Sequence, residues 1–191
     1  MITNHVKSAT GDSSISQEDI LNWIDHGNGI PSNQRFWTLD PIDGTKGFLR
    51  GDQYAICLAL IEGGDVKIGI IACPALEIDG SVGHLFVAEK GQGAWRKSLH
   101  DDTTSFTRIR VDARSVAEGS LIQSFEASHG NHSAQRAVAK EIGLNSVINM
   151  DSQAKYSMVA SGNAALYLRL SSHSEKIWDH AAGAVLVEEA G

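Results

Sequence analysis

Two long apolar runs that meet at a Gly-Gly-Asp turn limit what this chain can fold into more than any other feature. The stretch YAICLALIEGGDVKIGIIACP covers residues 54–74, and its two halves join at Gly63-Gly64-Asp65. Glycines favour a β-hairpin at such a point because they adopt positive φ at little cost. Further strand-like segments flank this hairpin: RFWTLD (35–40), HLFVAEKGQGAW (84–95) and FTRIRV (106–111). The sequence up to about residue 112 therefore predicts an antiparallel sheet.

After residue 112 the pattern changes, because strands begin to alternate with helices. The predicted order is strand 120–126, helix 133–144, strand 146–150, helix 152–162, strand 164–170 and helix 178–191. Such alternation is typical of a layered α/β unit. Upstream of the first sheet, SISQEDILNWIDHG (14–27) predicts a short helix capped by Ser14 or Ser16.

These patterns together predict an α+β fold in three parts. The parts are a flexible lead-in over residues 1–15, an antiparallel-sheet unit over 16–112 and a smaller α/β unit over 113–191.

Composition and charge exclude several classes of protein. The formal net charge of −7 over 191 residues argues against a general nucleic-acid-binding protein, which would carry a basic face. No apolar run approaches the roughly 18 residues that span a bilayer, and the segment 1–16 lacks the apolar core of a signal peptide. Two cysteines, Cys57 and Cys73, are too few for a disulfide framework. We expect a cytoplasmic protein that binds neither nucleic acid nor membranes; nothing in the sequence indicates an oligomeric state.

The segment LDPIDGTKGF (39–48) places two carboxylates, Asp40 and Asp43, beside a proline and a glycine. Carboxylates at this spacing converge if the backbone between them turns sharply, and the carbonyl of Ile42 can then point the same way. An all-oxygen group of this kind suits a hard cation such as Mg²⁺, and the hydroxyl of Thr45 is placed to orient a water molecule. The alternative is ordinary turn chemistry, in which each aspartate accepts a hydrogen bond from a nearby backbone N–H.

A third carboxylate stands in EKIWDHAAG (175–183), where Asp179 lies at the start of the last predicted helix. Backbone N–H groups at a helix start favour negative charge, so Asp179 can be an N-cap. Its other possible role is that of a third oxygen ligand for the same cation.

Four segments, residues 37–64, DSQAKY, YLRL and EKIWDHAAGAVLVEEAG, carry a family resemblance. They resemble the 3′(2′),5′-bisphosphate nucleotidases of fungi and plants, which belong to the lithium-sensitive, magnesium-dependent superfamily of sugar and inositol phosphatases. The resemblance covers about residues 16–191. It implies a layered αβαβα fold of the sugar-phosphatase type that is incomplete at both termini of this chain.

The resemblance also implies roles for individual residues. Asp40, Asp43 and the main-chain oxygen of Ile42 would bind Mg²⁺, and Asp179 would complete the metal site from the second part of the chain. Thr45 would act with Asp43 in catalysis by activating the attacking water, and both Thr45 and Asp179 would contact the substrate. The implied partner is a small-molecule nucleotide, and the residues implied to hold it are His129, Ser152, Lys155 and Arg169.

Cationic and hydroxyl side chains suit a second phosphate group, with arginine able to bind it in bidentate fashion. Taken from the residues alone, the sequence favours a solvated helix lysine for Lys155 and an N-capping serine for Ser152, and Arg169 can be a sheet-edge arginine.

The implied activity is removal of the 3′-phosphate from adenosine 3′,5′-bisphosphate to give AMP and phosphate, with the sulfated analogue as a second substrate. The family carries a helical layer before the position of residue 16, with an acidic metal-ligand segment and a catalytic aspartate that have no counterpart here. Three explanations stay open: a fragment of a nucleotidase, a shortened inactive descendant, or a working protein in which a neighbouring chain or a local acid replaces the missing metal-ligand glutamate. The alternative functions are an inositol phosphate phosphatase and a non-catalytic nucleotide-binding remnant.

Overall fold

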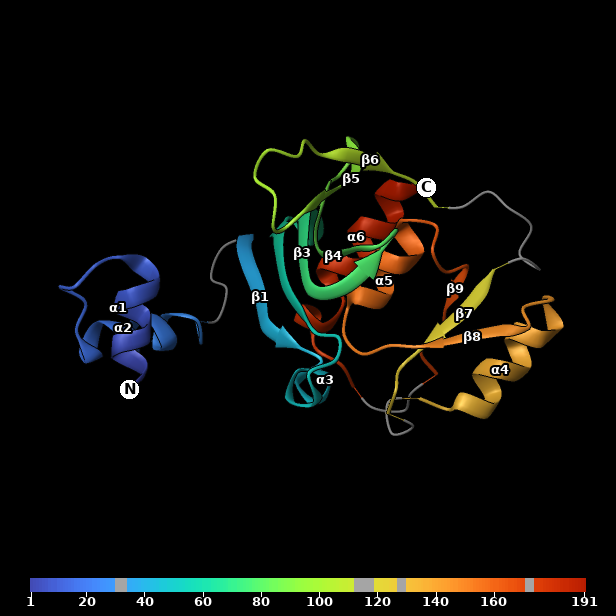
Figure 1. Cartoon of the computed structure of the whole chain (residues 1–191), viewed down its shortest axis with the longest axis horizontal. Helices are drawn as coiled ribbons and strands as arrows, with labels where there is room; N and C mark the ends of the chain where they lie inside the picture. Colours follow the sequence, from blue (N-terminus) through green and yellow to red (C-terminus); the bar gives the residue numbers. More distant parts are fainter. Residues whose placement is uncertain (30–33, 112–118, 127–129, 171–173) are drawn as a thin grey trace. The chain divides into compact units, whose positions relative to one another are not determined.

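The computed structural model describes residues 1–29, 34–111, 119–126, 130–170 and 174–191 (Figure 1). Through its internal contacts the chain divides into two units, Met1–Gln34 and Arg35–Gly191. The expected boundary at residues 112–113 borders the segment 112–118, which lies outside the described residues, and it stays a prediction.

The first unit contains the helices α1 (Ile2–Thr10) and α2 (Gln17–His26). Helix α2 confirms the helix predicted there, with Ser16 as its cap. The Ser16 hydroxyl accepts a hydrogen bond from the backbone N–H of Asp19, whose carboxylate accepts one from the backbone N–H of Ser16. The sequence does not predict α1, which lies in the expected lead-in, because α1 buries no residue and has no side-chain cap.

A six-stranded antiparallel sheet dominates the second unit, with its strands in the order β1-β2-β3-β4-β5-β6. The sheet confirms the antiparallel unit predicted from the sequence, including the hairpin in which Glu62 pairs with Asp65. The strands are β1 (Arg35–Asp43), β2 (Ala55–Glu62), β3 (Asp65–Ile78), β4 (Ser81–Glu89), β5 (Gly93–Ser98) and β6 (Thr107–Ile109).

The rest of the second unit follows the predicted alternation of strands and helices. Its strands form a small parallel sheet in the order β8-β7-β9. In chain order the elements are β7 (Ser120–Gln123), α4 (His132–Glu141), β8 (Ser146–Asn149), α5 (Ala154–Ala160), β9 (Leu166–Tyr167), the 3-10 helix Ile177–Asp179 and α6 (Ala181–Ala190).

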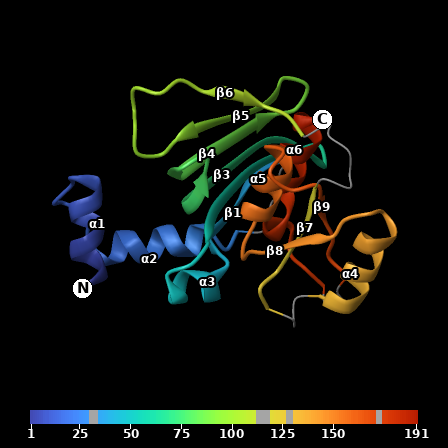
Figure 2. The same ribbon diagram turned by 45° about the vertical axis from the view of Figure 1, so that its right-hand side comes forward.

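Helices α5 and α6 form the middle layer of the second unit. They lie between the six-stranded sheet and the small sheet, and α4 lies on the far side of the small sheet (Figures 1 and 2). The main core joins one face of the large sheet, including Ile71 and Phe86, to Val185 and Leu186 of α6. A Cβ added at Gly69 of β3 would lie 2.5 Å from a methyl carbon of Val185, so this glycine allows α6 to pack closely against the sheet. The layered α+β class predicted from the sequence is confirmed.

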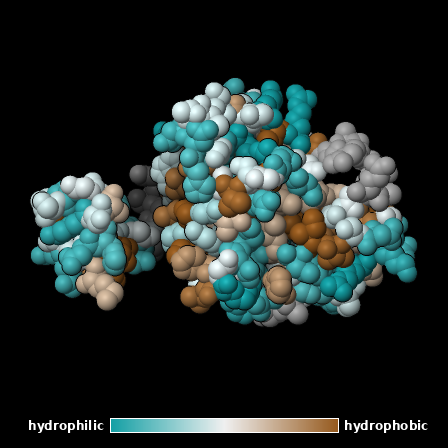
Figure 3. All heavy atoms as spheres, viewed as in Figure 1, coloured by the Kyte–Doolittle hydropathy of each residue, from teal (hydrophilic) through white to brown (hydrophobic). Residues whose placement is uncertain are grey.

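The opposite face of the large sheet is partly exposed. Trp37 and Leu39 of β1 are each 52% exposed and Ile56 of β2 is 38% exposed, and the register of the two strands places all three on one face. Figure 3 shows hydrophobic side chains interspersed among hydrophilic ones on the side of the molecule seen there. Among the described residues, none of the helices has the length and apolar character that crossing a membrane requires.

Candidate active site

A β-bulge in β1 brings Asp40 and Asp43 to one face of the large sheet. Asp40 pairs with Cys57 and Asp43 pairs with Ala55, so β1 holds one residue more than β2 over this stretch. In a regular strand, side chains three positions apart point to opposite faces. The extra residue cancels that difference, and both aspartates point to the buried side, where α5 and α6 pack.

The expected sharp turn between the two aspartates is therefore wrong, because the structure has an irregular strand there. Gly44 has a left-handed backbone with φ of 78°, which glycine adopts at little cost. The chain continues from Gly44 directly into a short helix, α3 (Thr45–Arg50), where we expected a loop.

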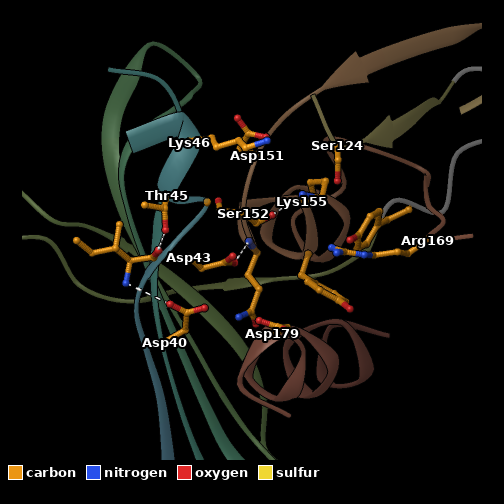
Figure 4. Close-up of a pocket in the computed structure, with 15 residues that line it drawn as sticks. Asp40, Asp43, Thr45, Lys46, Ser124, Asp151, Ser152, Lys155, Arg169 and Asp179 are labelled. Atoms are coloured by element: carbon orange, nitrogen blue, oxygen red, sulfur yellow. Dashed lines mark hydrogen bonds between the residues drawn. The ribbon is translucent and has the colours of Figure 1, made fainter. Parts of the chain in front are cut away.

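A pocket of about 390 Å³ opens where this face of the sheet meets α5, the 3-10 helix and the small sheet. Figure 4 shows the side chains of Asp40, Asp43 and Asp179 around it, together with those of Lys155 and Arg169. The structure therefore brings together residues that are distant in the sequence. The charged groups in the lining are the carboxylates of Asp40, Asp43, Asp151 and Asp179 and the cations of Lys46, Lys155 and Arg169.

Backbone amides orient the three carboxylates predicted to bind metal. The N–H of Ile42 donates to Asp40 Oδ1 at 3.2 Å, the N–H of Gln153 donates to Asp43 Oδ2 at 2.5 Å, and the N–H of Lys176 donates to Asp179 Oδ2 at 2.7 Å. These bonds also fit the turn and capping roles left open by the sequence. All three aspartates also line the pocket.

Burial and mutual repulsion raise the free energy of the ionised aspartates, and therefore their pKa values. Burial and the negative charges of Asp43 and Asp179 together raise the pKa of Asp40 to about 6, although the hydrogen bond from the Ile42 N–H opposes the shift. Burial also raises the pKa of Asp43, although the hydrogen bond from Gln153 and the charge of Lys155 oppose that shift. A bound cation would remove the repulsion that raises these pKa values.

The donor set fits a hard divalent cation in its chemistry, because it consists of carboxylate oxygens and the carbonyl oxygen of Ile42. That carbonyl accepts a hydrogen bond from the Thr45 hydroxyl at 3.1 Å. Within the described parts of the chain, however, no three His, Cys, Asp or Glu side chains are grouped closely enough to hold a metal ion. The aspartates share a pocket, and their side chains do not form a closed ligand set.

Lys155 is buried rather than solvated, with 3% of its surface exposed. Its ammonium donates to the carbonyls of Ser152 at 2.8 Å and Met150 at 3.2 Å. Burial lowers the pKa of Lys155 to about 8, and the charge of Asp43 opposes this shift. Lys155 therefore places a positive charge behind Asp43 at neutral pH.

The other predicted nucleotide-binding residues differ in their surroundings. Arg169 lines the pocket and forms an ion pair with Glu175. Ser152 also lines the pocket, and its hydroxyl accepts a hydrogen bond from the N–H of Ala154 at 3.2 Å, as a capping serine does. His129 belongs to the segment 127–129, which lies outside the described residues.

Several residues of the pocket were not predicted from the sequence. Gln153 lines the pocket and bonds to Asp43 through its backbone, and the pocket residue Asp151 forms an ion pair with Arg50, which also pairs with Glu126. No local pattern marks these residues, since each partner lies far away along the chain. The only available signal for Gln153 is its place inside the DSQAKY segment.

The fold and the pocket together define a class: layered α+β proteins in which carboxylates from a bulged strand and from a distant helical segment face one pocket. Within this class the chain belongs to the inositol monophosphatase family, whose family model matches residues 1–191. Proteins of this family are metal-dependent phosphatases.

Individual relatives within this family are also similar to the chain. The chain is 40% identical to "3′(2′),5′-bisphosphate nucleotidase 2" of Candida albicans, over all of this chain and 61% of the relative. It is 42% identical to "3′(2′),5′-bisphosphate nucleotidase 1" of Arabidopsis thaliana, over 94% of this chain and 55% of the relative. Among solved structures, an IMPase of Thermotoga maritima matches with a TM-score of 0.67 and 26% identity, over 92% of this chain and 66% of that chain. The chain thus spans between about half and three fifths of the length of the two nucleotidases.

Proposed function

We propose that the pocket serves a magnesium-dependent phosphatase that converts adenosine 3′,5′-bisphosphate to AMP and phosphate, with the sulfated analogue as a second substrate. One observation carries the proposal: carboxylates of β1 and of the 3-10 helix share a single pocket with the cations Lys155 and Arg169. The similarity to two 3′(2′),5′-bisphosphate nucleotidases supports the choice of substrate. Such an activity would act on by-products of sulfate assimilation.

Asp40, Asp43, Asp179 and the Ile42 carbonyl would hold Mg²⁺. When bound, Mg²⁺ neutralises charge that develops on the phosphoryl oxygens and acidifies the attacking water. The carboxylates would hold the cation on one side of the pocket. Without the cation, their own negative charges would repel the substrate phosphate.

Thr45 orients the water in this proposal. Its hydroxyl donates to the Ile42 carbonyl, so its oxygen lone pairs point elsewhere and can accept a hydrogen bond from water. Net hydrolysis adds water across the ester: a new P–O bond forms, the bond to the 3′ oxygen breaks, and that oxygen takes a proton.

The cations would hold the nucleotide. Arg169 offers guanidinium donors to a phosphate group, and Lys155, which uses two donors on backbone carbonyls, retains a third. We include Ser152 and His129 in the nucleotide site on the strength of the family resemblance.

The test is phosphate release from adenosine 3′,5′-bisphosphate by the 191-residue chain in Mg²⁺, with inositol monophosphate as the competing substrate. Asp43→Asn should lower turnover at least about 100-fold, since even residues that only support metal ligands contribute 10–100-fold. Asp65→Asn, at the exposed tip of the β2–β3 hairpin, should leave turnover unchanged. Lithium should inhibit the parent chain. Faster release from inositol monophosphate would assign the pocket to the other branch of the family.

A second candidate, nucleotide binding without catalysis, follows from one observation. The described acidic side chains do not form a closed ligand set. This candidate predicts heat of nucleotide binding by calorimetry in saturating Mg²⁺ with no release of phosphate. Phosphate release that depends on Asp43 would exclude it.

A further inference from the structure

We propose that Gln153 is a positioning residue that holds the Asp179 segment in place relative to Asp43, and that metal affinity depends on its side-chain amide. The inference rests on the proposed function, because it assigns Gln153 to the same metal site.

Gln153 is bonded to both acidic segments at once. Its backbone N–H donates to Asp43 Oδ2. Its side-chain Nε2 donates to the carbonyl of Trp178 at 2.8 Å, and its Oε1 accepts from the N–H of Gly183 at 3.1 Å. Trp178 directly precedes Asp179, so one residue connects the β1 bulge to the 3-10 helix and to α6.

The bonds of Gln153 are strong constraints because the residue is buried, with 2% of its surface exposed. A carboxamide offers a donor and an acceptor side by side in one plane, and both are used here. Replacing it with an apolar side chain would leave a carbonyl and an N–H without partners in a site that water hardly reaches, which is costly.

Close packing of α5 on α6 brings the side-chain amide of Gln153 within hydrogen-bond distance of the Gly183 N–H. A Cβ added at Gly183 would lie 2.3 Å from ring carbons of Tyr156 in α5, so the two helices can approach this closely only because residue 183 is a glycine. The approach sets the Gly183 N–H against the first turn of α5, next to Gln153. The start of α6 is thereby fixed at two neighbouring points.

A fixed position matters for a group of carboxylates that repel one another. Without a cation, repulsion between the Asp43 and Asp179 carboxylates favours their moving apart. Cation binding then has to bring them together again, which costs free energy. Bonds that hold the segment near its bound position reduce that cost, which is the general effect of groups that orient metal ligands. Because the backbone bond from Gln153 to Asp43 persists in any variant, a substitution at 153 isolates the link to residues 178–183.

The experiment is a titration of the chain with Mn²⁺ alone, followed by electron paramagnetic resonance of the free ion. Gln153→Met should weaken Mn²⁺ binding about 10–100-fold, the range for residues that orient metal ligands. The matched control is Gln135→Met: Gln135 is also 2% exposed and its amide donates to the Leu168 carbonyl, outside the acidic site. Thermal unfolding in EDTA, recorded for both variants, shows whether they lose comparable stability.

The proposal is supported if Gln153→Met loses Mn²⁺ affinity and Gln135→Met retains it at comparable stability. It is overturned if Gln153→Met binds Mn²⁺ within about twofold of the parent, or if both variants lose affinity equally. If Gln153→Met does not fold, Gln153→Asn takes its place, because the shorter amide cannot reach both partners and should still weaken binding. A parent chain that binds no Mn²⁺ overturns the proposed function and this inference together, which distinguishes that failure from the failure of Gln153 alone.

Discussion

Gly44 and Ser152 lie in direct contact where the end of β1 meets the segment before α5: a Cβ added at Gly44 would lie 2.8 Å from the Cβ of Ser152. Both residues have left-handed backbones, with φ of 78° and 66°. Serine rarely adopts this conformation, which costs on the order of 1 kcal/mol or more. The contact brings Asp43, just before Gly44, to the N–H of Gln153, just after Ser152.

Gly44→Ala should therefore destabilise the protein for two reasons. A left-handed alanine costs about 1–2 kcal/mol, and the contact with Ser152 should add about 1–3 kcal/mol of overpacking. The control is Gly80→Ala, whose φ is 76° with nothing within 4 Å of the added Cβ, so that only the first cost applies. Urea unfolding measures both; equal losses in the two variants would mean that the Ser152 contact contributes nothing.

Much of the large sheet could be predicted from the sequence because its signals are local. The Gly63-Gly64 turn and the apolar runs beside it determine a hairpin wherever they occur. The convergence of Asp40 and Asp43 was also predictable, although its cause was not. Proline and glycine suggested a turn, whereas a bulge arises from pairing with β2, which a single strand does not reveal.

The support of the site could not be predicted, because it consists of bonds between distant segments. Gln153 looks like an ordinary helix residue until α6 is placed beside it. Lys155 entered the predicted site only through the family resemblance, and its burial depends on the packing of α5 between two sheets. The sequence identifies candidate functional groups, but only the tertiary packing determines which of them lie close enough to act together.

Asp40 should make the metal-free chain less stable as pH rises. Its pKa is raised to about 6 in the folded protein from 3.8, so the folded state binds the proton more tightly. The stability it contributes is complete below about pH 4 and is lost as pH rises through 6. Since Asp40 is only partly buried, solvent screening reduces the loss to about 1 kcal/mol.

Urea unfolding in EDTA at pH 4.5 and 7.5 checks this effect. Asp40→Asn should reduce the difference in stability between the two pH values by the share that Asp40 contributes, whereas Asp65→Asn should not. Saturating Mg²⁺ should restore stability in the parent above pH 6, because the cation binds the ionised carboxylates. A parent-like pH dependence in Asp40→Asn would contradict the cause assigned here.

Arg50 should stabilise the fold more than Lys46 does. Its guanidinium bonds to Asp52, Glu126 and Asp151, and the Asp151 side chain is only 6% exposed. Removing the partner of a buried carboxylate leaves a charge uncompensated, whereas an exposed pair contributes little.

Arg50→Met should accordingly lower the urea midpoint clearly, and Lys46→Met, which breaks a pair whose lysine is 60% exposed, should hardly change it. In the double variant Arg50→Met/Asp151→Asn, part of the loss should be recovered, because the buried charge is removed as well. Equal midpoints for Arg50→Met and Lys46→Met would show that Asp151 does not depend on Arg50.

The two cysteines should be unreactive as long as the second unit is folded. Cys57 and Cys73 are 2% and 0% exposed, and burial raises the pKa of both thiols, with the charge of Asp43 adding to the shift. A thiol reacts as the thiolate, so both access and ionisation are suppressed. Reaction with a disulfide reagent should be about 5,000-fold slower than in concentrated urea, as expected if it requires unfolding that costs about 5 kcal/mol. Thr103→Cys, which adds a thiol at an exposed position, should react at once and to one equivalent. Rapid modification of Cys57 or Cys73 in the native protein would show that the core between the large sheet and α5 opens far more readily than its packing indicates.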